Sequence, residues 1–270
     1  MIFAIKNIKV ARANLLMNDF CAGLPSPLAL LGFGDAIARQ LGLTPWSVGV
    51  IPVIHGVSAS SGRTKPEMQY KGGVFSPVET VEDLTGYINI SMLLDIPDLE
   101  SAATLRDLIP LLRICGGTIQ NNTIDVVDVT SDGSAFRGFH RGFAMVHPGE
   151  DRAKMTTTGV TEELRLFARE LFPAERQPGS GWHVPSAVGY RLIEDPETVP
   201  MRSKTRSKTV PHVFAEPMLG IAELISVRNA RLTSLLNNDL ESFFWRWHAD
   251  GAHVVGHPSY HPSYTSTPKD

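Results

Sequence analysis

The stretch LPSPLALLGFGDAIARQLG, residues 24–42, carries the strongest helix signal in the sequence. Ser26 followed by Pro27 is typical of a helix start, because a serine side chain caps the first turn and the N–H that proline lacks is not needed there. Apolar residues then recur on roughly one face, at Leu28, Leu31, Ala38 and Leu41. Gly42 is a natural terminator, so the sequence predicts an amphipathic helix up to that glycine.

Strand signals flank this helix. Residues 2–10 alternate and are rich in Ile, Phe and Val, and residues 48–57 (VGVIPVIHGV) form a second apolar run. Pro52 inside the second run favours an edge strand or a bulge, because proline cannot donate to a strand ladder. A third strand is expected at 87–94 (YINISMLL).

The alternation of strands and helices continues after the third strand. A helix is expected over about 99–112, capped by Ser101. Gly116 and Gly117 then break the chain before another strand, and 142–147 (GFAMVH) indicates a further one.

The order strand, helix, strand, strand, helix, strand is the ferredoxin-like arrangement that RNA-recognition-motif domains also use. We therefore predict an α+β fold, with a ferredoxin-like domain over residues 1–150 and residues 151–270 as a C-terminal elaboration that packs on it. Residues 58–86 are too long for a hairpin loop, so we expect an inserted loop or thumb that is either functional or disordered. Fold alone assigns no function.

The sequence pattern changes after about residue 150. A helix is expected at 161–172 (TEELRLFARELF), followed by a Pro/Gly-rich stretch at 173–200. Two short helical segments are expected at 213–225 and 229–248. The last twenty or so residues are rich in turn formers and are expected to be peripheral.

Composition excludes several classes of protein. With 43% hydrophobic residues among 270, the chain can bury a full core. Lys6, Lys9 and Arg12 interrupt the apolar N-terminus and no long apolar stretch follows, so we expect neither a membrane span nor a secretory signal, and a cytoplasmic location. Cys21 and Cys115 have no CxxC partner, which favours buried thiols over a disulfide or a zinc site.

The net charge of −3 argues against coating nucleic acid through bulk positive charge, so any phosphate binding must be local. Residues 198–215 lack acids and carry cations at every second position, at Arg202, Lys204, Arg206 and Lys208. In an extended chain alternate residues share one face about 6.7 Å apart, which would let four cations follow the phosphates of a stretched single strand. The alternative is a solvated surface loop.

Two other segments combine cations with aromatic residues. The first contains Phe136, Arg137, Phe139, His140 and Arg141. Its aromatic rings are either stacking surfaces for single-stranded RNA or core residues at a strand entrance. The second lies in the insertion and contains Arg63, Lys65, Tyr70 and Lys71. A protruding loop there could wedge between bases or clamp a backbone, or be disordered until it binds.

Metal and catalytic motifs are weak. His253, His257 and His261 recur at every fourth position, but the glycines and prolines among them argue against the helix that would align them as ligands. His55 and Asp35 could form half of a dyad, yet no nucleophile elbow, HExxH or Walker pattern accompanies them. We therefore expect no metal, no cofactor and no catalytic residue.

Aromatic residues near the C-terminus have two possible roles. Trp182 and Tyr190, in GWHVPSAVGY, lie either at an RNA or partner surface or in the core. A second group forms an aromatic stripe at Phe243, Phe244, Trp245 and Trp247. If that stripe is exposed, it marks a subunit contact.

Several stretches in a fixed order resemble one family, the Cas-five-type subunit (second Csy protein) of the type I-F CRISPR surveillance complex. The matching stretches are residues 24–42, SMLL at 91–94, LRICGGTI at 112–119, RGFAMVHP at 141–148, GWHVPSAVGY at 181–190, and the basic run leading into VFAEPMLGIAEL at 213–224. The chain looks shorter than typical members, which suits a variant of that system.

The resemblance implies a non-catalytic scaffold that binds the 5′ handle of CRISPR RNA. Its implied protein partners are the large subunit and the first Cas-seven-type backbone subunit, and it meets target DNA only through the complex. Besides the basic clusters, Arg113 and the backbone amides near Gly116 and Gly117 are expected to bind RNA. The guide RNA would read the target sequence, while the protein reads backbone and shape.

One alternative stays open. Related Cas-five-type proteins in other CRISPR subtypes cleave RNA, so the chain could be a metal-independent endoribonuclease on the same fold. His55, His140 or His212 would then serve as general acid and base in processing CRISPR RNA.

Overall fold

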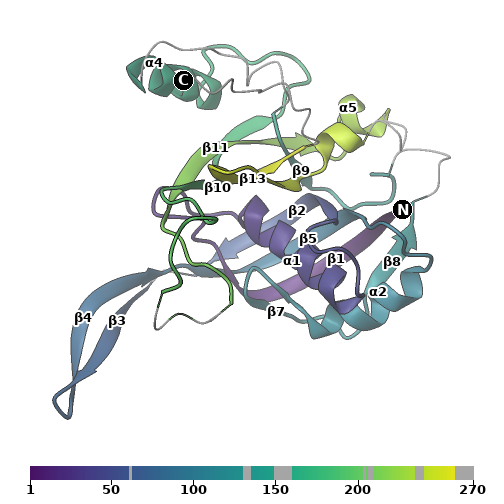
Figure 1. The fold of residues 1–270 in the computed structure, drawn as a ribbon. Coiled ribbons are helices and arrows are strands. Elements are labelled where there is room, and N and C mark those ends of the chain that lie inside the picture. Colours follow the sequence, from purple (N-terminus) through teal and green to yellow (C-terminus); the bar gives the residue numbers. More distant parts are fainter. Residues whose placement is uncertain are drawn as a thin grey trace.

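In the computed structural model the chain is built on one large antiparallel sheet with few helices (Figure 1). The structure describes residues 1–60, 63–129, 135–148, 160–202, 205, 209–234 and 240–258, with residues 63–67, 77–83, 160 and 163 as backbone only. The described strands of the sheet follow the order β12-β13-β10-β11-β9-β2-β5-β1-β7-β6, and β8 also pairs with β1.

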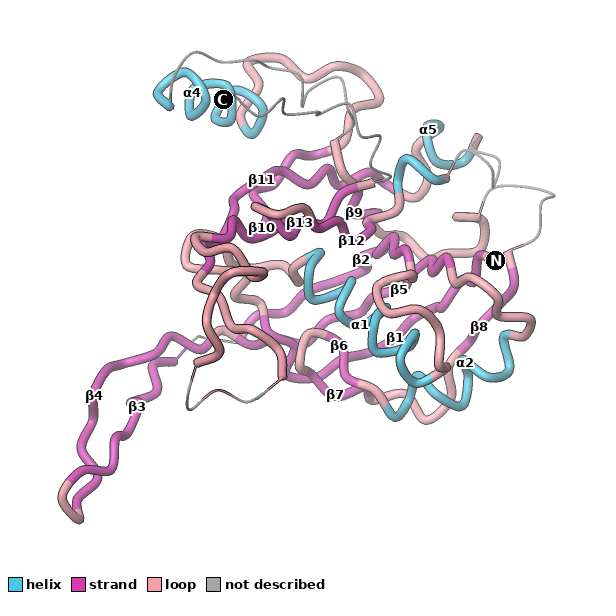
Figure 2. The backbone as a smooth tube through the Cα atoms, in the orientation of Figure 1, coloured by secondary structure: helices cyan, strands magenta, loops and turns pink. Residues whose placement is uncertain are grey.

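Figure 2 shows the strands and the helices along the backbone. The sheet strands are β1 Ile2–Asn14, β2 Gly49–Ala59, β5 Thr85–Asp95, β6 Arg113–Ile114, β7 Gly117–Ile119, β8 Asp125–Asp128, β9 Phe143–Val146, β10 Trp182–Leu192, β11 Ala215–Ser226, β12 Arg246–Ala249 and β13 His253–His257. The helices are α1 Pro27–Gln40, α2 Ala102–Leu108, α4 Val160–Leu171 and α5 Ala230–Thr233, with short 3-10 turns η1 Ile109–Leu111 and η3 Glu241–Phe243.

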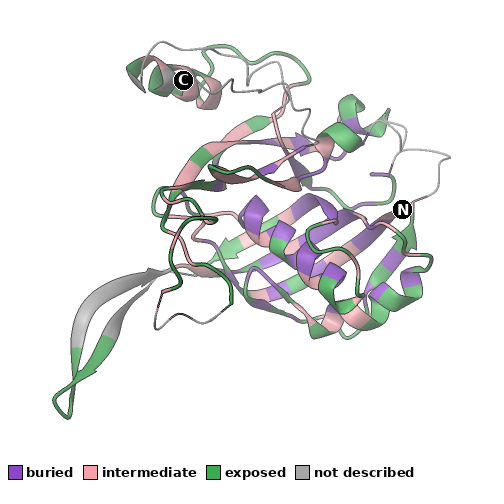
Figure 3. Ribbon diagram, in the orientation of Figure 1, coloured by how far each residue is buried: buried purple, intermediate pink, exposed green. Residues whose placement is uncertain are grey.

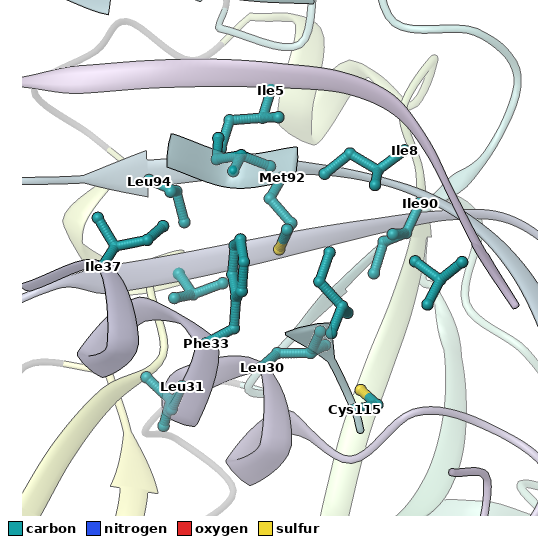
Figure 4. Packing of buried hydrophobic residues seen from close by; sticks show 14 of the residues in the cluster. Ile5, Ile8, Leu30, Leu31, Phe33, Ile37, Ile90, Met92, Leu94 and Cys115 are labelled. Atoms are coloured by element: carbon teal, nitrogen blue, oxygen red, sulfur yellow. The ribbon is translucent and has the colours of Figure 1, made fainter. Parts of the chain in front are cut away.

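Helix α1 forms where the sequence predicts it. The Leu28 N–H donates to Ser26 Oγ at 3.2 Å, so the serine caps the first turn, and Pro27 occupies the first helical position. The helix ends at Gln40, and Gly42 has the positive φ of +68° that favours glycine after a helix. Helix α1 lies against β2 and β10, and Leu30 and Phe33 lie among core residues that β1 and β5 contribute (Figure 4).

Helix α2 covers the same side of the sheet. Ser101 Oγ accepts from the Ala103 N–H at 3.2 Å, which confirms the predicted cap, and η1 replaces the last predicted turn beside Pro110. Leu105 is fully buried in the cluster that α1 also joins. The core on this side therefore lies between the two helices and the sheet (Figure 3).

The opposite side of the sheet carries a second core. Its members from the sheet include Ile51, Val53 and Leu93, which alternate with residues of the first core along their strands. The residues that cover them come from later in the chain and include Phe136, Phe139, Leu232, Leu240 and Phe244. Both faces of the central strands are thus apolar over part of their length.

Strand β2 is not an edge strand, although Pro52 favours one. It lies between β5 and β9, and the register shift falls between Ile54 and Gly56 instead of at the proline. Ladder bonds on the β9 side involve Val53 and Ile54, while Val50 forms an isolated bridge to Trp245. Pro52 therefore lies where the hydrogen bonds on the β9 side of β2 are interrupted, so no N–H is needed at this position.

The insertion at 58–86 forms a hairpin. Strands β3 Arg63–Lys71 and β4 Val74–Asp83 pair with each other in a separate two-stranded sheet, joined by Gly72 and Gly73, both with positive φ. Figure 1 shows this hairpin extending away from the large sheet. The prediction of an inserted thumb holds, and the expected irregular loop is replaced by regular strand pairing.

The helix predicted at 213–225 is wrong. Residues 215–226 are strand β11, which pairs with β10 along its length and with β9 near its end. Pro217 and Gly220 both disfavour a helix, and a Cβ at Gly220 would lie 2.7 Å from Val188 of β10. Pairing with β10, which lies within the Pro/Gly-rich stretch at 173–200, decides the outcome.

The helix predicted at 229–248 is also wrong. Only α5, capped by Asn229, and the short turn η3 are helical in the described part of that segment, and the chain then continues as β12. The C-terminal residues predicted to be peripheral include β13, which pairs with β10 and β12. The predicted helix at 161–172 is confirmed as α4.

Candidate nucleic-acid interface

A tight turn joins β6 and β7 next to the start of α1. Cys115 and Gly116 are its central residues, with φ of +49° and +74°, the pattern of a type I′ turn. Burial raises the pKa of the Cys115 thiol to about 12, so this cysteine is an unreactive core group. Gly117 packs against β1, because a Cβ there would lie 2.7 Å from Val10 Cγ1.

An open hollow lies between this turn and α1. It has a volume of about 360 Å³ and is lined by Asn14, Ala29, Gly32, Phe33, Arg113, Cys115 and Gly116. A Cβ at Gly32 or Gly116 would meet no atom within 4 Å, so both glycines leave space. The Arg113 guanidinium borders the hollow and donates to the Gly116 carbonyl at 3.2 Å. Of the predicted RNA-binding residues, the structure thus brings Arg113 and Gly116 together.

Residues 137–142, called here the cationic loop, cross the face of the sheet opposite α1. Phe136 and Phe139 are 3% and 9% exposed and belong to the second core, so the core interpretation of these aromatic residues is confirmed and stacking on bases is not available to them. Arg137, His140 and Arg141 are exposed. Two buried rings therefore hold a loop that presents three basic side chains.

His55 anchors the C-terminal end of the cationic loop. Its Nδ1 lies 3.1 Å from the Arg141 carbonyl oxygen, and its Nε2 lies 2.6 Å from Ser91 Oγ. The His140 ring stands edge-on to it with ring centroids 6.4 Å apart. Asp35, the other half of the considered dyad, binds Arg39 and the Trp46 N–H instead. No dyad of Asp35 and His55 forms.

The hairpin tip presents apolar and basic side chains to solvent. Tyr70 is 62% exposed and Phe75 65%, and their rings pack at 4.9 Å. Lys71 beside them is exposed. Arg63 and Lys65 lie near the base of β3, and their side chains fall outside the described part of the structure.

The basic run is only partly described. Lys204, Arg206 and Lys208 lie outside the described residues. Arg202 Nη2 pairs with Glu194 Oε1, its Nη1 donates to the His212 carbonyl at 3.0 Å, and its guanidinium lies 4.4 Å from the Phe214 ring. Hydrogen bonds from the Phe214 N–H and from Arg202 hold the pKa of Glu194 below its usual range. Arg202 thus fastens this segment to Glu194 and to the residues just before β11, and its charge is already paired with a carboxylate.

Two of the aromatic residues on β10 are exposed. Trp182 is 55% exposed and Tyr190 41%, which places both at the surface and not in the core. Arg176 stacks on the indole, with Cζ 3.0 Å from the ring centroid. His183 next to it bonds the Glu170 carbonyl at 2.9 Å and so fastens α4 to β10.

The C-terminal aromatic stripe is largely internal. Trp245 and Phe244 are 1% exposed, and the Trp245 Nε1–H donates to the Met145 carbonyl at 2.9 Å. The condition for a docking surface is therefore not met at these two residues. His253 and His257 lie on β13, and His261 is outside the described residues; the part of the chain that the structure describes contains no group of three metal-ligating side chains.

Sequence reasoning missed Lys6 as a member of this interface. A Cβ placed on Gly138 would lie 3.5 Å from Lys6 Nζ, so the ammonium group of β1 reaches the cationic loop. The alternation of residues 2–10 could have indicated that Lys6 faces away from the helix side, but only the folded chain brings it to residue 138.

Comparison with known proteins supports the resemblance. Residues 151–255 match the family model described as CRISPR-associated protein (Cas_Csy2), which confirms the family indicated by the motifs over that part of the chain. No curated protein matches. Among the described residues, no helix is both long and apolar enough to cross a membrane. The match supports a subunit of a CRISPR surveillance complex.

Proposed function

We propose that this chain is a non-catalytic scaffold subunit of a type I-F CRISPR RNA-guided surveillance complex and binds the 5′ handle of CRISPR RNA in the cytoplasm. The family match over residues 151–255 supports membership of such a complex. The observation that carries RNA binding is the cationic loop, where Arg137 and Arg141 are exposed and form no ion pair with any described residue.

A ferredoxin-like core is part of the proposal. Strands β2, β5, β1 and β7 are neighbours in this order, α1 connects β1 to β2, and α2 follows β5. This order, with the hairpin β3–β4 inserted, supports the strand, helix, strand, strand, helix, strand arrangement. Residues 1–150 would be the RNA-binding unit, and residues 151–270 would pack on it through β9, which lies between β2 and β11.

The described surfaces offer different chemical groups for binding RNA. Arginine forks on the cationic loop suit phosphate oxygens, because guanidinium groups bind them through two parallel hydrogen bonds. The hollow beside Arg113 offers a guanidinium and room above two glycines, which suits a splayed nucleotide. Tyr70 and Phe75 at the hairpin tip offer rings on which bases can stack, with Lys71 near for a phosphate. The remaining cations of the basic run would extend this path.

Protein partners would use the exposed apolar groups. On α4, Leu164 is 63% exposed, and Phe172, just after the last residue of the helix, is 80% exposed. The indole of Trp182 is also exposed on β10 nearby in sequence. These groups would contact the large subunit, and the first Cas-seven-type subunit would dock elsewhere on the chain. Target DNA is reached through the assembled complex.

An endoribonuclease is the second candidate, because the rings of His55 and His140 are close enough to act on one phosphodiester. Burial of Ser91, which is 0% exposed, argues against it, since His55 Nε2 points at this buried hydroxyl and not at solvent. His140 alone is exposed, and His212 bonds the Val210 carbonyl within its own loop. General acid and base catalysis needs two groups within reach of the substrate.

The test is RNA binding by the complex reconstituted from this chain, its large subunit, the backbone subunits and CRISPR RNA. Arg137→Gln combined with Arg141→Gln should flatten the dependence of log affinity on log salt by about 1.4, or roughly 0.7 per lost phosphate contact. The matched control is Arg191→Gln with Arg228→Gln, which removes the same charge from exposed arginines elsewhere. Equal slopes for both double variants, or a complex that protects the 5′ handle without this chain, would overturn the proposal.

A further inference from the structure

A chain of hydrogen bonds joins three strands to the cationic loop on the face opposite α1. It begins at β1, where the Asn7 N–H donates to Ser91 Oγ of β5 at 2.9 Å. Ser91 Oγ lies 2.6 Å from His55 Nε2 of β2, and His55 Nδ1 lies 3.1 Å from the carbonyl oxygen of Arg141. The partners are separated by 84, 36 and 86 residues in sequence, so this series of hydrogen bonds exists only in the folded protein.

The direction of each hydrogen bond can be assigned. A carbonyl oxygen only accepts, so His55 Nδ1 carries the proton and donates to Arg141. In the neutral ring Nε2 is then an acceptor, and the Ser91 hydroxyl donates to it. Burial, with a smaller contribution from the charge of His140, lowers the pKa of His55 from its ordinary value and keeps the ring neutral near pH 7. Each hydrogen bond in this series therefore has one donor and one acceptor.

The cationic loop lies directly on the sheet at this point. A Cβ at Gly142 would lie 2.6 Å from His55 Nδ1 and 2.8 Å from the Ile54 carbonyl oxygen, which leaves no room for a side chain. Gly138 has a φ of +86°, a conformation that glycine adopts without strain. Phe139 is buried between these two glycines. The loop is thus held by the core on one side of His140 and by His55 on the other.

Three cations surround this part of the loop. Lys6 Nζ reaches Gly138, and Arg137 and Arg141 are exposed on either side of His140. Asp125 faces Lys6 across the pairing of β1 with β8, yet among the described residues Lys6 forms no ion pair. In a chain with a net charge of −3, three cations that form no ion pair with any described residue favour an anionic ligand.

We propose that Lys6, Arg137 and Arg141 form one phosphodiester-binding site for single-stranded RNA, and that His55 is the positioning residue that holds the loop on the sheet. This rests on the proposed RNA-binding function and goes further by adding Lys6 to the site and by assigning a role to the His55–Ser91 pair. His55 touches no RNA; it acts through the Arg141 backbone.

The experiment measures RNA affinity against salt for the reconstituted complex with single-stranded CRISPR RNA. Lys6→Gln should flatten the slope by about 0.7, because one phosphate contact is lost. His55→Phe keeps a ring but removes both hydrogen bonds, and it should flatten the slope by about 0.7, because Arg141 loses its position while the buried Phe136 and Phe139 still hold Arg137. His55→Asn should restore most of the slope, because its amide N–H can replace Nδ1–H. His253→Phe, on β13, is the matched control and should leave the slope unchanged.

The outcomes separate this inference from the proposed function. If the wild-type complex binds RNA equally well with and without this chain, the proposed function fails. If the wild-type chain contributes to binding but Lys6→Gln and His55→Phe keep its slope, the function stands and the site is overturned. If His55→Asn behaves as His55→Phe does, the positioning role is overturned. Hydrogen exchange of residues 137–142, faster in His55→Phe alone, would support that role independently of RNA.

Discussion

Replacement of Trp245 by alanine tests whether the C-terminal part of the chain is integral to the fold. This indole is 1% exposed, its Nε1–H donates to Met145 of β9 at 2.9 Å, and its backbone exchanges two hydrogen bonds with Val50 of β2, at 2.9 and 3.0 Å. Loss of a buried tryptophan side chain costs about 3–5 kcal/mol. In a protein of this size that lowers the melting temperature by roughly 10 °C.

The assay is thermal and urea unfolding of both Trp245→Ala and Trp182→Ala. Trp182 is the matched control, because it loses the same atoms from a site that is 55% exposed, where a surface change costs about 1 kcal/mol or less. Trp245→Ala should unfold in one transition at a clearly lower temperature. Equal melting temperatures for the two variants, or a separate early transition that leaves residues 1–150 folded, would refute the view that both parts share one core.

Three further predictions concern acid sensitivity, the packing of two glycines on β7 and α1, and the hairpin. Burial, helped by the charge of His257, lowers the pKa of His147 to about 4, so the contribution of the neutral ring to stability is complete above pH 6.5 and is lost as the pH falls from 6.5 toward 4. His147→Gln should remove up to about 3 kcal/mol of this acid dependence in urea unfolding. An unchanged pH profile would contradict this prediction. Gly117→Ala should destabilise the fold, because its Cβ would lie 2.8 Å from the Ala11 carbonyl. Gly32→Ala on α1 should be neutral or stabilising by about 0.5–1 kcal/mol, because its Cβ would meet no atom within 4 Å. A lower melting temperature for Gly32→Ala than for Gly117→Ala would count against the packing described. Tyr70→Ser combined with Phe75→Ser should leave the melting temperature unchanged and weaken RNA retention by the complex, and a large loss of stability would show that the hairpin tip belongs to the core.

Local signals in the sequence predicted the elements that depend on local physics. Ser26 with Pro27, and Ser101, mark helix starts because their caps act within a few residues, and the structure contains both caps. The predicted strands of the N-terminal half follow from alternation against the two cores. Strand β11 was missed because Ile221 and Ile225, four residues apart, imitate a helix face, while the pairing with β10 that decides the outcome is a tertiary contact.

The site was predictable as a list of basic residues but not as an arrangement. Nothing in the sequence distinguishes Arg141, which is exposed on the cationic loop, from Arg202, which is paired with Glu194. The partners of His55 come from distant strands, so no spacing in the sequence indicates them. Phe136 and Phe139 fitted two roles equally well until their burial assigned them to the core.

The most direct test of the central claim is photocrosslinking of CRISPR RNA in the assembled complex, followed by identification of the crosslinked peptides and of the RNA length without added metal. We predict crosslinks from this chain within residues 137–142 and near Arg113 or the hairpin tip, with the RNA intact. Absence of any crosslinked peptide from this chain would contradict it. RNA cleavage that disappears on replacing His55 or His140 would contradict it equally, since it would establish the endoribonuclease.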